Sequence, residues 1–437
     1  MRTRQTSRGE AFPPNQLDPP DAPARHRRSS VALIAIGFFL TTFSQPAQVG
    51  GLSLRLLLKD HLHLAPSDLA NFFAVAALAW YLKPLAGLLC DMVPLFGSKR
   101  RSYLLSSVLL GCLLWFGIGQ VTNSVPWLLW LVVSLNAAIV VASTVLGGIL
   151  VEAGRQDGNT GQLVSWKFVA NNLAGLLVGP ISGYLAMRAF TLTSWTGALT
   201  LLPLWLLGWR VLRGESLAEP VARHYAAEAI RQIRIVATDR GLVCAIGFLF
   251  LVGLAPGFDT PLLYYQTDDL HFLPSFLGWL ALMRGLLGLI GAVAYGLLCE
   301  RWPLRRLLIT GVVLHAFGSI LFLTYISPVS ALVVESIYGI CYALALLPLF
   351  DLAARATPRG SEAMGLAVVM SLWNVSNAVS DVIGSWLFTN YRTGFLSLVW
   401  LNASTTLCVL PFLRLIPAAL IQRSQAEERA SAFTGKS

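Results

Sequence analysis

Long apolar stretches separated by short polar segments fill the chain from residue 31 to residue 416. An α-helix needs roughly 20 apolar residues to cross the hydrocarbon core of a bilayer, and twelve stretches are long enough. They run over 31–56, 69–90, 103–121, 126–150, 163–187, 192–212, 241–266, 275–299, 307–326, 328–352, 363–388 and 394–416. Six precede residue 213 and six follow residue 240. The pattern predicts an all-α membrane protein with twelve transmembrane helices in two six-helix, pseudo-symmetric halves.

A five-residue phrase occurs twice in the chain, as Gly87-Leu88-Leu89-Cys90-Asp91 and as Gly296-Leu297-Leu298-Cys299-Glu300. The two copies lie 209 positions apart (Asp91 to Glu300), each ends an apolar stretch in an acid, and each precedes a basic cluster. Two similar membrane halves that rock about a site between them give alternating access. The repeat therefore favours a transporter.

Composition supports a membrane protein and sets its orientation. Hydrophobic residues make up 55% of the chain and charged residues 12%, with a mean hydropathy of +0.65. Lys and Arg favour the cytoplasmic side in short loops; nine lie in the loops after the second, fourth, eighth and tenth stretches, and three in the opposite loops. We expect a multi-pass protein of the cytoplasmic (inner) membrane with both termini in the cytoplasm.

The remaining polar segments predict tails and a linker. Residues 1–30 hold five prolines and six arginines and should be a disordered cytoplasmic tail. Residues 213–240 place apolar and basic residues at helical spacing, which predicts an amphipathic helix on the inner membrane surface. The expected organisation is tail 1–30, first half 31–212, linker 213–240, second half 241–417 and cytoplasmic tail 418–437.

Charge and cysteine usage exclude other classes. The net charge of +10 is spread over loops and therefore does not favour nucleic-acid binding. The six cysteines form no close Cys-x-x-Cys pair, so neither a metal site nor a disulfide framework is expected. No hydrolase motif and no phosphate-binding loop is present. We therefore expect neither an enzyme nor a cofactor nor ATP-driven transport.

Several motifs in both halves carry a family signature: Leu58 to Pro66, Trp80 to Gly97 with Lys99-Arg100-Arg101-Ser102-Tyr103, Pro256, Tyr264-Tyr265, Leu277-Gly278, Tyr295, Pro358 to Ala363, Ala367, Met370-Ser371, Asn374 and Val379-Ser380. They resemble the motifs of the folate-biopterin transporter family, a branch of the major facilitator superfamily. The resemblance covers residues 50–390 and implies a fold of the major facilitator type and a secondary transporter for a folate- or pterin-like organic anion.

Acids and bases recur together at the predicted cytoplasmic ends of the helices. We expect them to form a latch whose contacts exist only while that side is closed; the alternative is that the bases only set topology. The gating candidates are Asp91, Lys99, Arg100, Arg101, Glu152, Arg155, Glu300, Arg305, Asp351 and Arg355.

Charges within the apolar stretches are the sharper signal, because an ionised side chain in hydrocarbon is costly and normally faces a partner or a pathway. We expect Lys83 and Arg284 to bind the anionic substrate, and Asp259 or Asp381 to exchange a coupling proton. In the alternative, Lys83 and Lys167 reach the interface and Asp259 or Asp381 neutralises Arg284. Glu335 should lie nearer the outer surface.

Polar and aromatic residues in matched stretches complete the candidate substrate site: Gln45, Gln48, Trp166, Asn171, Asn374 and Asn377. Gln45, Pro46 and Gln48 interrupt the first stretch as Pro256-Gly257 interrupts the seventh, and paired interruptions point to a binding site. In the alternative, Trp166 serves only packing in the membrane. His315 is expected to be a packing residue and not a proton relay.

The preferred function is proton-coupled transport of a folate- or pterin-like anion by a monomer in the lipid bilayer. The alternatives are a permease of the same fold for another solute, such as a muropeptide or a drug-like amphiphile, and a non-transporting membrane scaffold or sensor. Such a scaffold could lose both the latch charges and the paired interruptions, which this chain retains.

Overall fold

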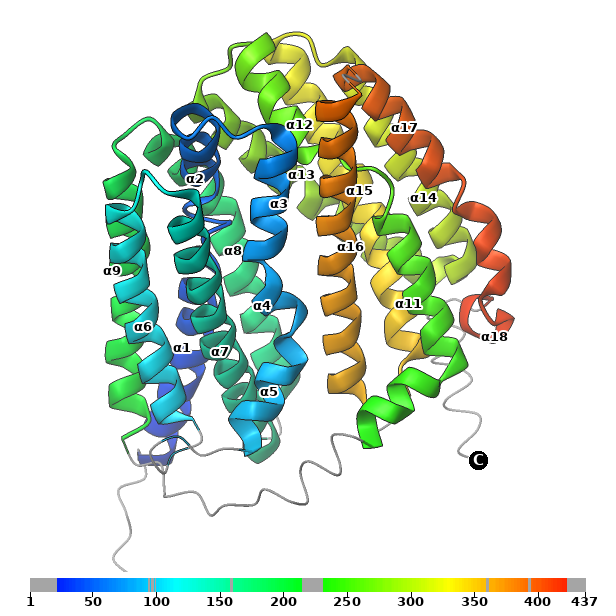
Figure 1. The fold of residues 1–437 in the computed structure, drawn as a ribbon. Helices are drawn as coiled ribbons and strands as arrows, with labels where there is room; N and C mark the ends of the chain where they lie inside the picture. Colours follow the sequence, from blue (N-terminus) through cyan, green and yellow to red (C-terminus); the bar gives the residue numbers. More distant parts are fainter. Residues whose placement is uncertain are drawn as a thin grey trace, which may run out of the picture.

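A bundle of long, roughly parallel helices forms the molecule (Figure 1). The computed structural model describes residues 22–92, 95, 98, 100–157, 160–213, 231–358, 361–391 and 394–422, without the side chains of 22–30, 88, 91–92, 155–157, 160 and 362–363. The elements within these ranges are helices, and one isolated bridge joins Leu95 and Ser98. The expected helical class is therefore confirmed.

Nine helices in the described part of the chain are long and apolar enough to cross a membrane. They are α6 (Arg101–Gln120), α7 (Val125–Asp157), α8 (Thr160–Ala186), α9 (Phe190–Val211), α13 (Pro274–Arg301), α14 (Leu304–Ile320) with η3 (Leu321–Thr324), α15 (Pro328–Ala356), α16 (Glu362–Asn390), and α17 (Phe395–Leu407) with η4 (Leu410–Leu415). Each overlaps one of the predicted stretches. The short helix α18 (Ala418–Ile421) follows the last of them.

The other three predicted stretches fold as broken helices. The first consists of α1 (Ala22–Phe43), a turn, α2 (Gly51–Leu56) and η1 (Leu57–His61). The second consists of α3 (Pro66–Ala76), α4 (Leu78–Tyr81) and α5 (Lys83–Met92). The seventh consists of α11 (Arg240–Gly253), α12 (Asp259–Tyr264) and η2 (Tyr265–Asp269). The interruptions expected around Pro46 and at Pro256-Gly257 are confirmed.

The breaks in the second stretch were not expected. Pro84 lacks an N–H and its ring clashes with the carbonyl of the preceding turn, so the helix restarts at Lys83. At the earlier break, the Asn136 amide on α7 donates to the Ala76 carbonyl (2.8 Å) and accepts from the Trp80 indole (3.0 Å). Freed backbone groups inside a membrane need such partners, so buried Asn136 stabilises the break.

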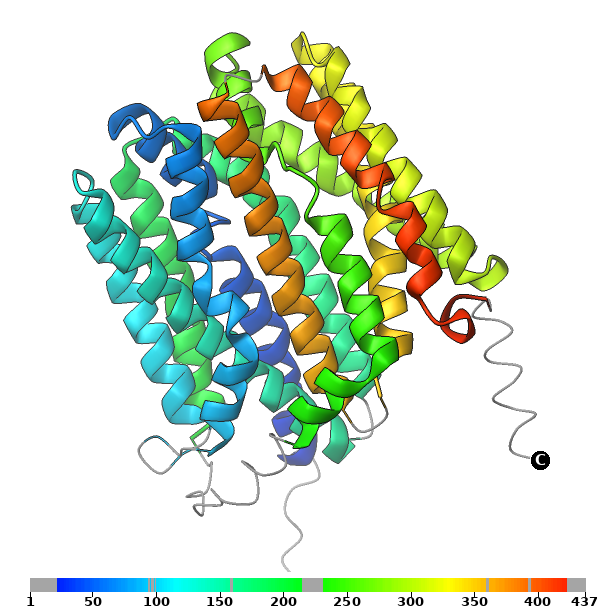
Figure 2. The same cartoon turned by 45° about the vertical axis from the view of Figure 1, so that its right-hand side comes forward.

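Figures 1 and 2 show the helices up to α9 gathered on one side and those from α11 onward on the other. We call them the first helix group (α1–α9) and the second helix group (α11–α18). The groups meet where α8 packs on α13: an added Cβ on Gly179 would stand 2.7 Å from the Gly278 carbonyl oxygen, and one on Gly183 would stand 2.8 Å from that of Pro274. Small residues allow this approach.

A second internal repeat, which the sequence analysis missed, lies at one end of the bundle. Asp60-His61-Leu62-His63 and Asp268-Asp269-Leu270-His271 are 208 positions apart. Each copy begins in the last two residues of a π-helical turn and precedes a helix that begins at a proline. His63 (φ 53°) and His271 (φ 52°) both adopt the left-handed conformation. We call this end the histidine end, and the opposite end, with Arg100, Arg301 and Arg355, the arginine end.

The predicted tails and linker lie largely outside the described residues, namely 1–21, 214–230 and 423–437. Helix α1 begins at Ala22, nine residues before the expected start of the first stretch. The described part of the linker contains helix Arg231–Thr238, which meets α11 at 71°. Its membrane-surface location stays a prediction.

Candidate functional site

Polar contacts join the two helix groups at the histidine end. The Lys59 ammonium bonds Asp60 (2.8 Å) on its own segment and Asp268 (2.5 Å) on the second helix group. Tyr264 donates its hydroxyl proton to the Leu64 carbonyl (2.5 Å), and the Ser67 N–H donates to the Thr389 hydroxyl (3.2 Å). These contacts hold the two groups together at this end.

Lys59 is well suited to this bridge. Burial by itself would lower the pKa of the Lys59 ammonium, but hydrogen bonds and charge attraction from Asp268 and Asp60 outweigh it, so the pKa lies above its ordinary value. The lysine therefore keeps its proton across the physiological range.

Side chains of α16 and α17 support the backbone of the break between α11 and α12. Ser380 donates its hydroxyl proton to the Ala255 carbonyl (2.5 Å) and accepts the Gly257 N–H at its own carbonyl (2.9 Å). The Asn402 amide donates to the Pro256 carbonyl (2.9 Å). The interruption predicted from Pro256-Gly257 is thus a built feature whose backbone groups are paired inside the bundle.

Two acids flank the restart of the helix at α12. Asp381 on α16 accepts the Thr260 N–H (2.9 Å) and the Thr260 hydroxyl proton (2.6 Å). Asp259, the first residue of α12, lies close enough to Asp381 for the two carboxylates to repel each other. From the first helix group, Arg55 donates to the Thr260 hydroxyl oxygen (3.3 Å) and its charge attracts Asp381. The sequence analysis did not single out Arg55, because it lies near the predicted end of the first stretch.

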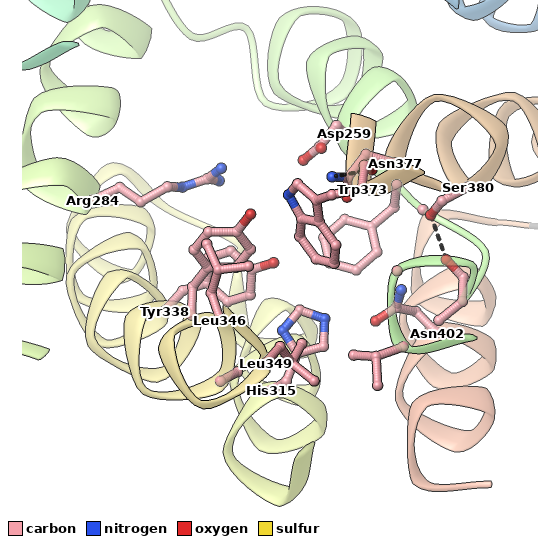
Figure 3. Close-up of a pocket in the computed structure, with 17 residues that line it drawn as sticks. Asp259, Arg284, His315, Tyr338, Leu346, Leu349, Trp373, Asn377, Ser380 and Asn402 are labelled. Atoms are coloured by element: carbon pink, nitrogen blue, oxygen red, sulfur yellow. Dashed lines mark hydrogen bonds between the residues drawn. The ribbon is translucent and has the colours of Figure 1, made fainter. Parts of the chain in front are cut away.

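A polar and aromatic cavity of about 240 Å³ opens beside this acid pair (Figure 3). Its lining combines one carboxylate, one guanidinium, one imidazole, four aromatic rings, two amides and a serine hydroxyl among apolar residues. The polar and aromatic lining residues are Phe258, Asp259, Arg284, His315, Tyr338, Tyr342, Trp373, Asn377, Ser380 and Asn402. Phe258 immediately precedes α12, and the others lie on α12 to α17 of the second helix group.

Arg284 has an ion-pair partner that the sequence analysis did not assign to it. Its Nε lies 2.6 Å from an Oε2 of Glu335 on α15, and only 2% of Glu335 is exposed. The Tyr325 hydroxyl donates to Glu335 (3.3 Å) and accepts from the Gln266 amide (2.6 Å), while the guanidinium carbon stands 5.1 Å from the Tyr338 ring centroid. Glu335 is therefore the ion-pair partner of Arg284, and the Asp259 carboxylate also attracts the Arg284 charge.

His315 forms part of the cavity wall. Its ring centroid lies 6.2 Å from that of Tyr338 and 6.1 Å from that of Tyr342. The histidine packs among aromatic rings, as expected, and also faces the same space as Asp259 (Figure 3).

The expected substrate residues fall into two sets. Arg284 and Asn377 line the cavity with Asp259. The other expected residues do not line it. Gln45 and Gln48 lie in the turn between α1 and α2, and Asn171 accepts a hydrogen bond from the Thr42 hydroxyl (2.9 Å). Trp166 is 44% exposed, and Asn374 is half-buried on α16.

Two lysines of the first helix group lie deep in the bundle. Lys83 donates to the Ser143 hydroxyl (3.1 Å) and stands 5.0 Å from the Trp80 ring centroid. Lys167 stands 4.9 Å from the Phe38 ring centroid. The two ammonium groups are close enough to repel each other. Neither lysine has a carboxylate within ion-pair distance among the described side chains.

At the arginine end, two of the gating candidates bond acids of their own helix group. Arg100 bonds Glu152 (2.6 Å). Arg355 bonds Asp351 (3.0 Å), which also accepts the Tyr295 hydroxyl proton (2.8 Å). The Arg101 guanidinium carbon stands 4.9 Å from the Trp209 ring centroid. Glu300 and Arg305 are exposed. The side chains of the remaining candidates, Asp91, Lys99 and Arg155, lie outside the described residues.

No group of three or more His, Cys, Asp or Glu in the described ranges is placed to hold a metal ion. The chemistry of the site is that of charge pairs, amide and hydroxyl hydrogen bonds and aromatic faces. It can bind and orient a polar planar solute.

Solved transporters share this fold. The chain is similar to the inward-open xylose transporter XylE from E. coli (TM-score 0.65, 15% identity, covering 93% of this chain and 99% of that one). It is also similar to the nucleoside transporter NupG (TM-score 0.65, 13% identity, covering 89% and 98%). The described part of the chain, with its nine spanning-length helices, therefore has the fold of these transporters.

The particular branch follows from the sequence. The profile of the BT1 family matches residues 47–433, and the chain belongs to that family. It is similar to a folate-biopterin transporter from Synechocystis sp. (29% identical over 389 residues, covering 84% of this chain and 78% of the relative). It is also similar to a probable folate-biopterin transporter 7 from Arabidopsis thaliana (27% over 390 residues, covering 83% and 86%). The resemblance noted from the motifs is confirmed.

Proposed function

We propose that the chain is a secondary transporter that moves a folate- or pterin-like organic anion by alternating access. The cavity beside the α11–α12 break carries this proposal: a broken helix next to aromatic rings, amides and an acid suits a flat heterocycle with hydrogen-bonding edges. The relatives named as folate-biopterin transporters support the substrate class.

We propose that the nine spanning-length helices and the three broken stretches form twelve crossings in two six-helix halves. The repeats at spacings of 208 and 209 support this layout, because each puts matching residues at corresponding helix ends. The excess of Lys and Arg at the arginine end supports a cytoplasmic location for that end and for both termini. Reporter fusions at residue 437 and after Asp269 should then report opposite sides, and matching sidedness would reject the layout.

The described contacts between the groups favour a state closed at the histidine end, where Lys59, Tyr264 and Ser67 join the two helix groups. In the opposite state, we propose, bases at the arginine end bond acids across the groups. Such charge-assisted bonds would act as the latch.

Coupling to a proton gradient is assigned to the pair Asp259 and Asp381. Two neighbouring carboxylates repel each other when both are ionised, so such a pair is a suitable place to exchange a proton. Arg55 sits beside this pair from the other helix group. Protonation of Asp381 would remove the negative charge that attracts Arg55. Because Arg55 belongs to the first helix group and Asp381 to the second, uptake of the proton would weaken the contact between the groups near the histidine end.

Proteoliposomes containing the purified chain provide the test. Labelled folate and biopterin should accumulate when a pH gradient is imposed, and Asp381→Asn should abolish accumulation. If neither compound accumulates or competes while another solute does, the substrate class is wrong and only the transporter class remains.

A further inference from the structure

The charges around the bundle interior are unevenly divided between the two helix groups. In the second group, buried Glu335 already neutralises Arg284. The remaining charged group in the cavity wall is the Asp259 carboxylate, which forms no ion pair with the described side chains. The cavity therefore suits a group that donates hydrogen bonds, and it disfavours the carboxylate of an anion.

The first helix group has the opposite imbalance. Among the described side chains, Lys83 bonds a neutral hydroxyl, Lys167 lies over a phenyl ring, and the two cations repel each other. Two uncompensated cations at membrane depth are costly. An anion placed between them would remove that cost, so this pair, and not Arg284, is the anion subsite.

The two subsites lie at different depths. An added Cβ on Gly285 of α13 would stand 3.0 Å from the Leu176 side chain on α8, so these two residues lie side by side. Gly285 directly follows Arg284 in the chain. Leu176 therefore lies at the same depth as Arg284. Lys167 lies nine residues nearer the arginine end on α8, which at 1.5 Å per residue is roughly 14 Å. Folate carries its carboxylates about ten bonds from its heterocycle, a reach comparable with that separation.

We propose that Asp259 accepts two N–H bonds from the amino-pyrimidinone edge of a pterin ring, while Lys83 and Lys167 bind the carboxylates of a folate tail. Trp373 and Tyr342 offer aromatic faces for the ring. The substrate then lies along the bundle with its anionic end toward the arginine end. This inference rests on the proposed function and names which part of the substrate each helix group holds.

The test compares three probes on the purified full-length chain: folate, biopterin, which lacks the carboxylate tail, and p-aminobenzoylglutamate, which lacks the ring. Lys83→Gln and Lys167→Gln should each weaken folate and p-aminobenzoylglutamate binding by about tenfold, the scale of one charge-assisted contact. In both lysine variants, the dissociation constant for biopterin should stay within about twofold of that of the unmodified chain. Asp259→Asn should weaken the binding of folate and of biopterin and leave the binding of p-aminobenzoylglutamate unchanged.

Two controls keep the result interpretable. Lys83→Arg retains the positive charge and should retain folate binding, which separates loss of charge from misfolding. Arg306→Gln removes an exposed cation that lies over Trp302, away from both subsites, and should change none of the three affinities.

Two outcomes would overturn the assignment and are distinguishable. If the unmodified chain binds folate and biopterin but the lysine variants weaken both equally, the orientation is wrong although the substrate class stands. If the unmodified chain binds none of the three probes, the proposed substrate class fails and the assignment fails with it.

Discussion

Lys59 bonds two aspartates that occupy equivalent positions in the two copies of a repeat. Asp60 and Asp268 lie 208 positions apart, each two residues before a leucine and three before a left-handed histidine, and the Lys59 ammonium reaches both. Position 267, which corresponds to Lys59, is a threonine. One cation thus joins the two copies at the histidine end.

Replacing Lys59 by Gln is expected to open the histidine end more often. The Lys59 side chain is 9% exposed but Asp268 is 52% exposed, so the pair is worth about 1 kcal/mol at most, or roughly a fivefold change in population. Labelling of a cysteine introduced at Ser67 would measure the opening. Asp269→Asn alters a neighbouring exposed acid and should have little effect; equal labelling in both variants would contradict the role of Lys59.

The pH dependence of this bridge follows from the sign of the lysine shift. Because the bridge raises the pKa of Lys59, its stabilising effect is present below the ordinary pKa and is lost as pH rises through the raised value. Labelling at Ser67 should therefore not increase across the physiological range through loss of the lysine proton.

A larger side chain at Gly179 is expected to disrupt the packing of α8 on α13. Gly179→Val would drive methyl groups into the backbone at Gly278, and overpacking of this kind costs about 1–3 kcal/mol. Thermal unfolding in detergent should show a lower midpoint and transport should fall. Gly175→Val lies one turn away on the same helix, where an added Cβ meets nothing within 4 Å. Its midpoint should stay close to that of the unmodified chain.

Removing the buried partner of Arg284 should destabilise the second helix group. Glu335→Gln leaves a guanidinium without its counter-charge, and breaking a buried pair typically costs about 3 kcal/mol. Pairing it with Arg284→Gln should recover part of the loss, because no charge is then left uncompensated. The midpoint of thermal unfolding of the two single variants and the double variant tests this, and strictly additive losses would contradict the coupling.

Arg55 is expected to matter for coupling more than for binding. Its contact with Thr260 and its attraction to Asp381 join α2 to the acid pair. Arg55→Gln should retain exchange of labelled for unlabelled substrate but lose most accumulation driven by a pH gradient. Arg188→Gln, an exposed arginine over Tyr184, is the matched control. Parallel loss of exchange and accumulation in the Arg55 variant would indicate a structural role.

Sequence reasoning located the helices because membrane hydropathy gives a strong, local signal. It also located the break at Pro256-Gly257, since neither residue sustains a helix. It missed the break near Ala77, because that break depends on Asn136, about 60 positions away along the chain.

Partners were harder to predict than positions. Arg284 and Glu335 are 51 residues apart, and the sequence offered Asp259, Asp381 and Glu335 without any indication of which acid faces the guanidinium. The repeat at spacing 208 could have been found from Asp60, Leu62, His63 and Pro66 against their counterparts. Its matches are interspersed with mismatches, so the uninterrupted Gly87-to-Asp91 phrase was the easier one to see.

The backbone pairing at the α11–α12 break has a consequence for biosynthesis. The carbonyls of Ala255 and Pro256 depend on Ser380 and Asn402, which the ribosome adds 125 and 146 residues later. Until α16 and α17 have been made, the nascent seventh stretch carries unpaired backbone groups that lipid cannot satisfy. Release of this segment from the insertion machinery should therefore wait for the last two helices. A chain truncated at Ala356 should stay cross-linked to that machinery.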